Sequence, residues 1–288
     1  MNRTYLTADE GLGTAYERVA IYRLFDRWLA PLGLQDAMEG PLDGMSGIPG
    51  LHLVGRARAG TRVTVELPDE EALGRVRAVY RHLGMGDRLS TQRGDVDPMR
   101  EEAFDLVVSY HALASLRDWE GYLARLARRA RRYLLVVVVS PYSYAVRLTR
   151  AMARFGMDER ARALLEHPSI WPEKLEPALG RLGTVRSHSY LDCPWWPETL
   201  GDSVGGWALG TARRLPVVGG LVPKPRVHTE PAAPSRLVYG PELFPYLPDH
   251  PAHGALRAAL RKHPVFDERG ETLARWFGHL HAYLVERP

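Results

Sequence analysis

The sequence predicts an α/β domain built on a doubly wound, mainly parallel sheet, and three observations support this. Short β-branched runs alternate with amphipathic helical segments over the first half of the chain. One run, 134–139 (LLVVVV), is apolar throughout, as expected for a central parallel strand covered on both faces. Polar residues directly follow several runs, at the strand ends where open α/β sheets bind ligands. The connections are expected to be right-handed crossovers.

The first element predicted along the chain is a helix. Its apolar stripe at helical spacing consists of Ile21, Leu24, Phe25, Trp28 and Leu32. Pro31 and Gly33 are predicted to end it. A short strand at 36–38 then leads into the glycine-rich stretch 39–50 (EGPLDGMSGIPG). A helix is predicted to follow this stretch, with Leu51 and Val54 inward and Gly60 as its stop.

Two further strand–helix units follow. Residues 62–67 (RVTVEL) alternate as a strand does, and the acidic residues 69–71 suit the positive N-terminus of a helix. Gly84 is predicted to stop that helix. A short polar strand at 89–92 and a buried strand at 104–110 (FDLVVSY) come next. The pattern is thus β–α–β throughout this part of the chain.

A basic helix is predicted over 118–130, and its Arg-rich run is 124–132 (ARLARRARR). Such a run can mark a nucleic-acid interface, or it can be the solvated face of a helix whose other face is buried. The spacing of Trp119, Tyr122 and Leu126 favours the solvated face. We therefore expect no nucleic-acid partner.

In the second half of the chain, predicted strands and helices no longer alternate regularly. Twelve of the 22 prolines lie in 193–275, a density that favours an irregular lid over a second folded core. The alternating residues after this stretch predict a last strand. The predicted organisation is an N-terminal helical cap (1–35), a sheet core (36–192), the Pro-rich lid (193–275) and a final strand of the core (276–288).

Composition excludes several classes of protein. A single cysteine, Cys193, excludes an internal disulfide or a CxxC metal site within this chain, and the eleven histidines are too scattered to predict a metal site. The longest apolar stretch, 133–139, is far shorter than the roughly 18 residues that span a bilayer, and the N-terminus has no apolar signal core. We expect a cytoplasmic protein without a membrane span. The formal net charge of +4 gives little information about the function of the protein.

The predicted strand ends indicate a nucleoside ligand. An acid at the end of the second strand can accept from both hydroxyls of a ribose, and Glu66 stands there. Glu39 ends the first strand 27 residues earlier, a longer interval than the roughly 20 residues of a dinucleotide fingerprint. The loop also has no GxGxxG, which a pyrophosphate needs for close backbone approach. NAD is therefore disfavoured, and a ligand without phosphate is favoured.

The order EGPLDG, VTVELPDEEAL, GDVD and FDLVVSYHAL, then a strand after a basic helix, resembles class I S-adenosylmethionine (SAM)-dependent methyltransferases of the methyltransferase-11 type. The resemblance covers roughly residues 36–191, and the ending FGHLHAYLVERP resembles their last strand, antiparallel between the fifth and sixth. It implies a Rossmann-like seven-stranded sheet with helices on both faces. It also implies SAM as cofactor and a small-molecule acceptor of the methyl group.

The resemblance assigns eleven residues to the cofactor, namely Glu39, Gly40, Pro41, Asp43, Gly44, Glu66, Leu67, Asp95, Val96, Ser109 and Tyr110. By it, Glu66 would hold the ribose, Asp95 would accept from the adenine amino group and Val96 would donate a backbone N–H to the ring. Ser109 and Tyr110 would line the methionine end.

The glycine loop departs from the family pattern of acid-x-Gly-x-Gly-x-Gly. The three glycine places hold Pro41, Asp43 and Met45. Proline removes a backbone donor, and a side chain at Asp43 hinders the close approach that glycine permits. Two alternatives follow. Either the loop takes another path, with Asp43 pairing with the SAM ammonium, or the loop no longer binds SAM.

Methyl transfer from a sulfonium is an in-line displacement in which the enzyme mainly supplies position and desolvation, so a base is optional. His111 could deprotonate a hydroxyl acceptor, or it could simply bond locally at a helix start. Tyr142 could wall an acceptor pocket, or pack its loop. The sequence thus predicts a methyltransferase for a small apolar or aromatic acceptor. The alternative is an inactive protein of this fold that serves as a binding or partner subunit. In either case the chain could have a protein partner or form a homodimer.

Overall fold

The structure is a computed structural model of the 288-residue chain. It describes residues 12–40, 50–94, 101–143, 146–147, 165–191, 254, 258 and 271–288. The predicted lid at 193–275 lies almost wholly outside these residues, so the division into four regions stays a prediction. No helix among the described residues is long and apolar enough to cross a membrane.

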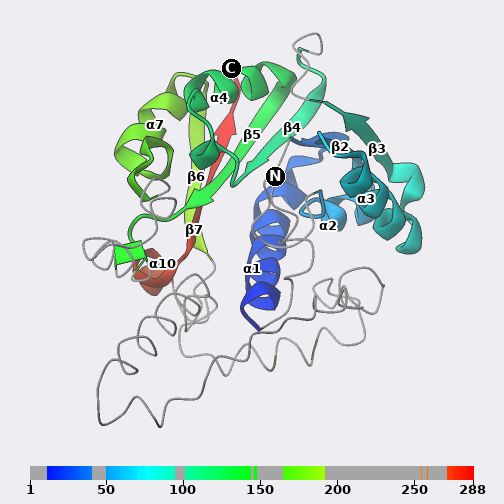
Figure 1. Ribbon diagram of the computed structural model, residues 1–288, viewed down its shortest axis with the longest axis horizontal. Helices are drawn as coiled ribbons and strands as arrows, with labels where there is room; N and C mark the ends of the chain where they lie inside the picture. The colour runs from blue at the N-terminus through cyan, green and yellow to red at the C-terminus, as the bar shows by residue number, and fades with distance from the viewer. Residues whose placement is uncertain are drawn as a thin grey trace, which may run out of the picture.

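Seven strands form one sheet (Figure 1). They are β1 (Asp36–Glu39), β2 (Arg62–Leu67), β3 (Leu89–Arg93), β4 (Phe104–Tyr110), β5 (Ala130–Val139), β6 (Thr184–Leu191) and β7 (Leu280–Glu286). Their spatial order is β3-β2-β1-β4-β5-β7-β6. Strands β1 to β5 pair in parallel, and β7 is antiparallel to both β5 and β6. This order confirms the predicted fold, including the antiparallel last strand.

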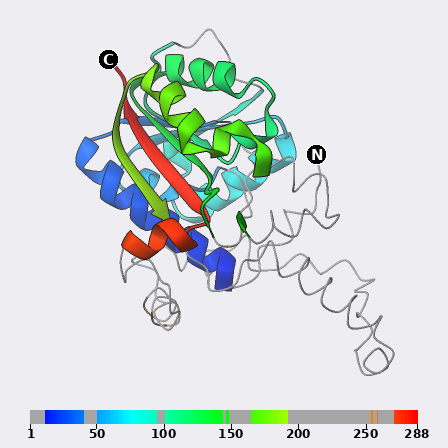
Figure 2. The ribbon, with the colours of Figure 1, turned by 90° about the vertical axis from the view of Figure 1, so that its left-hand side faces the viewer.

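Helices cover both faces of the sheet (Figures 1 and 2). On one face, a buried cluster joins the strands to α1 (Leu12–Leu29), α2 (Val54–Arg58) and α3 (Glu70–His82). On the other face, a second cluster joins them to α4 (Trp119–Arg129) and α7 (Pro172–Gly180). The remaining helical pieces are η2 (Ala30–Leu32), η3 (Gly86–Arg88), η4 (Leu113–Ser115), η5 (Pro168–Ile170) and α10 (Glu271–Phe277).

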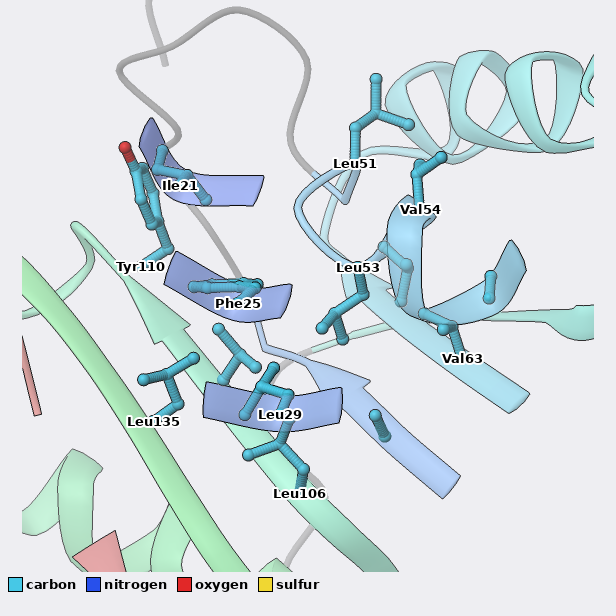
Figure 3. Packing of buried hydrophobic residues seen from close by; sticks show 14 of the residues in the cluster. Ile21, Phe25, Leu29, Leu51, Leu53, Val54, Val63, Leu106, Tyr110 and Leu135 are labelled. Carbon is cyan, nitrogen blue, oxygen red and sulfur yellow. The ribbon is translucent and has the colours of Figure 1, made fainter. Parts of the chain in front are cut away.

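The apolar stripe predicted for the first helix packs α1 onto the sheet. Phe25 of this stripe, together with Leu29, which the predicted stripe did not include, is buried against Leu106 of β4 and Leu135 of β5 (Figure 3). Burying such a side chain contributes roughly 1.5–3 kcal/mol. Burial of this stripe therefore determines which face of the sheet α1 covers.

The helix ends follow the predicted signals. Asp69 accepts a hydrogen bond from the Glu71 N–H at 2.9 Å and so caps α3. Gly84, with φ 72°, follows the end of that helix. Asp118 caps α4 in the same way, by accepting from the Gly121 N–H at 3.1 Å. Both helices thus begin at an aspartate that caps them.

The arginines of the Arg-rich run form ion pairs and hydrogen bonds with other residues of the protein. Its ion pairs are Arg125–Asp118, Arg128–Glu101, Arg129–Glu66 and Arg131–Asp105. Arg132 donates to the Leu32 carbonyl at 3.2 Å. The prediction of a solvated face is wrong for Arg129, whose side chain is only 1% exposed. An arginine can occupy this buried position because a carboxylate meets it there.

Candidate functional site at the strand ends

The sheet register brings the predicted strand-end residues to one level. Glu39 of β1 lies opposite Val65 of β2 and opposite Val108 of β4. Glu66 and Ser109 are the next residues along their strands, so all three polar side chains lie within one residue of the same level. All three are buried. The structure thus places all three at the carboxyl ends of β1, β2 and β4, with the Glu39 side chain on one face of the sheet and those of Glu66 and Ser109 on the other.

Glu39 is held by the chain that returns after the glycine-rich stretch. Its Oε1 accepts from the Gly50 N–H at 3.0 Å and lies within hydrogen-bonding distance of His52 Nδ1. Its Oε2 is buried and has no hydrogen-bond partner among the described residues. One carboxylate oxygen therefore binds Gly50 and His52, and the other accepts no hydrogen bond from the described residues.

His52 connects Glu39 to α1 through Tyr110. The His52 ring stacks on Tyr110, with ring centroids 4.0 Å apart and an interplanar angle of 27°. The Tyr110 hydroxyl in turn donates to Glu17 of α1. Tyr110, predicted to line the methionine end of the cofactor, is fully buried in this arrangement. It links β4 to the N-terminal helix, near Ile21 (Figure 3).

Glu66, the predicted ribose acceptor, has a protein cation beside it. Arg129 Nη1 of α4 donates to Glu66 Oε2 at 2.6 Å, and the side chains are 1% and 0% exposed. The guanidinium carbon also lies 5.8 Å from the centre of the Phe104 ring. Sequence reasoning missed this partner. One signal was present, because Arg129 follows Leu126 by three residues and so continues the apolar stripe of its helix.

Three other predicted cofactor residues are described at the same edge. The Ser109 Oγ is buried and has no hydrogen-bond partner in the part of the chain that is described. Gly40 donates to the Val108 carbonyl at 3.0 Å, and a Cβ on it would meet Leu126 Cδ2 at 3.3 Å. Leu67 is a core residue whose carbonyl accepts from the Gly94 N–H at 3.3 Å. Gly40 is thus a tight contact between β1 and α4.

His111 stands just past the end of β4 in an unusual backbone conformation. Its φ is 57°, in the left-handed region that non-glycine residues rarely adopt. Its N–H donates to the Val137 carbonyl at 2.9 Å, and its Nε2 has no hydrogen-bond partner among the described residues. Burial, with the nearby His52 and His279, lowers the pKa of His111 to about 3. The ring is therefore neutral at pH 7.

Tyr142 lies in a separate aromatic cluster after β5. Its hydroxyl donates to Glu173, and its ring meets Trp171 edge-on at 6.2 Å between centroids. The Arg275 guanidinium lies over the ring at 5.2 Å from its centre. Burial and the bond to Glu173 raise the pKa of Tyr142 to about 12. Tyr142 is therefore a neutral phenol at pH 7 and a packing partner of α7 and α10.

The remaining predicted cofactor residues, Pro41, Asp43, Gly44, Asp95 and Val96, lie outside the described residues. No group of three or more histidine, cysteine, aspartate or glutamate side chains in the described part of the chain could hold a metal ion.

No family model and no curated protein sequence matches the chain. Solved structures of similar shape include magnesium protoporphyrin IX methyltransferase from Synechocystis PCC 6803 with bound S-adenosylhomocysteine (SAH), at 16% identity over 59% of this chain and 75% of that one, with a TM-score of 0.47. A SAM-dependent methyltransferase from Aquifex aeolicus shares 12% identity over 66% of this chain and 92% of its own (TM-score 0.45). The cyclase SpnF shares 13% identity over 93% of this chain and 80% of its own, with a TM-score of 0.49.

The strand order, with an antiparallel strand between the fifth and sixth, decides the architecture. The chain has the class I methyltransferase fold. In this fold the carboxyl ends of β1, β2 and β4 form one edge, and the polar residues described above all lie on it.

We expect Gly50→Ala to destabilise the folded chain by roughly 2–4 kcal/mol. Gly50 has φ 86°, its N–H bonds to Glu39, and a Cβ there would lie 2.7 Å from Val65 Cγ1. Urea unfolding measures the effect. The matched control is Gly55→Ala in α2, where a Cβ meets nothing within 4 Å. Equal stability of the two variants would contradict the close contact at Gly50.

Proposed function

We propose that the protein is a SAM-dependent methyltransferase that acts on a small apolar or aromatic acceptor. The observation that carries the proposal is a set of three buried polar atoms without hydrogen-bond partners among the described residues, namely Glu39 Oε2, Ser109 Oγ and His111 Nε2. They lie at or just past the ends of the adjacent strands β1 and β4. An unmet buried polar group costs about 1–3 kcal/mol, so a ligand that supplies partners would be favoured there.

The residues fit SAM in chemical kind. SAM carries hydroxyl and ammonium donors, and the strand ends of β1 and β2 present the carboxylates of Glu39 and Glu66. The Ser109 hydroxyl can bond to either a donor or an acceptor. When bound, SAM would supply a methyl group already activated on a sulfonium. The protein would then need to position the acceptor and exclude water.

His111 would orient the acceptor rather than take its proton. A pKa of about 3 leaves the imidazole neutral, with Nε2 able to form a hydrogen bond, but makes it a weak base at pH 7. Left-handed φ values in non-glycine residues are concentrated at functional sites, where the surrounding structure maintains them. The role that we propose for His111 is therefore a hydrogen bond that positions an acceptor hydroxyl or amine.

A second function, that of a non-catalytic binding or partner subunit, is favoured by one specific observation. Arg129 already holds Glu66 in a charge-assisted hydrogen bond of 2.6 Å inside the protein. Ribose hydroxyls would have to compete with this cation for the carboxylate. If they fail, the fold keeps its architecture without its cofactor.

Calorimetric titration with SAH distinguishes the two functions, and Ser109→Ala sharpens the test. If the protein is a methyltransferase, we expect SAH to bind and Ser109→Ala to weaken binding about two- to tenfold, as the loss of one hydrogen bond does. The same variant should leave the ligand-free stability unchanged or higher, because the Ser109 Oγ has no described partner.

The control for Ser109→Ala is Ser90→Ala, at an exposed position on β3. It should change neither SAH binding nor stability. Absence of any SAH binding at millimolar concentration would contradict the methyltransferase and support the partner subunit. Destabilisation of the ligand-free protein by Ser109→Ala would show that the hydroxyl has a structural role instead.

A further inference from the structure

The aromatic cluster around Tyr142 lies at the end of β6, where α7 and α10 contact that strand (Figures 1 and 2). The Tyr142 ring meets Tyr190 at 6.4 Å between centroids with an interplanar angle of 64°, and it meets Trp171 at 89°. Rings at such steep angles do not stack, so the Tyr142 ring face is not covered by either of them. All three side chains are only half-buried.

A cation of the protein itself lies on the open ring face. The guanidinium carbon of Arg275, from α10, is 5.2 Å from the centre of the Tyr142 ring, within the roughly 6 Å of a cation–π contact. Burial raises the pKa of Tyr190 and Arg275 counteracts this rise, so the guanidinium also lies near that phenol. Arg275 is exposed and forms no salt bridge with a described residue. The ring face is thus its described contact, and a ligand could displace it.

Two carboxylates of α7 lie beside these rings. Glu173 accepts from the Tyr142 hydroxyl, and Glu176 accepts from the Tyr283 hydroxyl at 3.1 Å. Neither carboxylate forms a salt bridge within the described part of the chain. The hydrogen bond to Glu173 also polarises the phenol and makes its ring more electron-rich. The cluster therefore combines an electron-rich ring with carboxylates that no ion pair neutralises.

The other basic residues nearby do not neutralise these carboxylates. Lys174 follows Glu173 on α7 but forms no salt bridge with a described residue. His188 and His281, which pack against Tyr190, are neutral at pH 7 because burial lowers both of their pKa values. The Arg275 guanidinium is therefore the cation that the rings hold in the described structure.

We propose that this cluster binds an organic ammonium ion over the Tyr142 ring, in the place that the Arg275 guanidinium occupies. The ring face would attract the cation, and Glu173 would supply the opposite charge. Arg275 would occupy the site when no ligand is present. The inference concerns α7 and α10, and it holds whether or not the strand ends bind SAM.

A matched pair of probes tests the charge. We expect choline to bind the full-length variant Arg275→Gln with a Kd on the order of 1 mM. The neutral compound 3,3-dimethylbutan-1-ol, which has the shape of choline without its charge, should bind this variant at least about tenfold more weakly. Ligand-observed NMR titration measures both. Equal affinity for the two probes, or no choline binding at about 20 mM, would overturn the proposal.

Comparison with the wild type tests the place of Arg275. The wild type should bind choline about three- to tenfold more weakly than Arg275→Gln, because its guanidinium competes for the ring face. The matched control is Arg125→Gln, which removes an arginine that lies 6.0 Å from the centre of the Tyr122 ring. Tyr122 is buried, so this variant should bind choline as the wild type does. Equal choline affinity in Arg275→Gln and the wild type would overturn the proposed position.

Substitutions added to Arg275→Gln then locate the site. Tyr142→Leu should abolish choline binding, whereas Tyr142→Phe keeps the ring face and should weaken binding far less. Glu173→Gln should weaken binding about three- to tenfold, because it removes the opposite charge. If Tyr142→Leu fails to fold, Glu173→Gln decides, since it changes an exposed side chain. Unchanged choline affinity in that variant overturns the proposal.

Discussion

The free energy of unfolding should fall by about 4 kcal/mol between pH 7 and pH 5, because two histidines are buried in their neutral form. Burial is the largest cause that lowers the pKa of His111 and of His281 to about 3 each. In the unfolded chain both titrate near their ordinary pKa of about 6.5. Between these values the unfolded chain binds more protons than the folded one, so acid favours unfolding. A loss of this size is a large fraction of a typical domain stability of about 5–15 kcal/mol.

The surroundings of His281 explain why it resists protonation. It is fully buried on β7, stacked on Tyr190 with ring centroids 5.8 Å apart, and 5.7 Å from the His188 ring. Burial also lowers the pKa of His188, so this neighbour is neutral at pH 7 as well. No carboxylate of the described residues is among the groups that shift the pKa of His281. An imidazolium there would lack both solvent and an opposite charge.

Urea unfolding at several pH values between 5 and 7 measures the effect, since most carboxylates titrate at lower pH. His281→Phe and His111→Asn should each remove about half of the pH dependence; asparagine suits the positive φ of His111. The matched control is His82→Gln, on an exposed helix end. A wild-type pH slope in both buried-site variants would show that other groups cause the acid sensitivity.

The fold was predictable because its signals are local. The apolar run of β5, the alternation of β2 and the stripe of α1 each fix an element, and their order fixes the sheet. The strand-end carboxylates Glu39 and Glu66 were predictable for the same reason. Their partners were not, because Arg129 reaches Glu66 across 63 residues of sequence and Tyr110 reaches Glu17 across 93. The place of Arg129 on the apolar stripe of α4 indicates its burial, but the partner of each such pair depends on tertiary packing that no local pattern encodes.

Breaking the buried pair between Glu66 and Arg129 should have a large effect on stability. Glu66→Gln leaves the Arg129 guanidinium buried without its carboxylate, and we expect a loss of about 3–5 kcal/mol in the free energy of unfolding. The matched control is Glu120→Gln, which breaks the surface pair with Arg181 at 2.7 Å, where the side chains are 55% and 61% exposed. Breaking an exposed pair costs only about 0–1 kcal/mol. Similar losses in the two variants would contradict the burial of Arg129.

The double variant Glu66→Leu with Arg129→Met tests whether the charges of this pair or the shapes of its side chains matter for stability. Replacing both partners by apolar groups of similar volume should restore the stability to near the wild type, because no charge is left buried alone. Unfolding of Glu66→Leu, Arg129→Met and the double variant in guanidinium chloride gives the coupling energy directly. A double variant as unstable as Glu66→Gln would mean that shape, and not charge, holds α4 against β2.

The same variants decide how Arg129 bears on the proposed function. If SAH needs the Glu66 carboxylate, Arg129→Met removes the competing cation and should tighten SAH binding, whereas the apolar double variant should lose it. If the carboxylate serves only Arg129, the wild type, Arg129→Met and the double variant should have the same affinity for SAH. Calorimetry on variants that remain folded distinguishes these results, because tighter binding by a less stable protein cannot arise from a general loss of structure. Glu66 then belongs either to a ligand or to the protein interior, and Arg129→Met shows which.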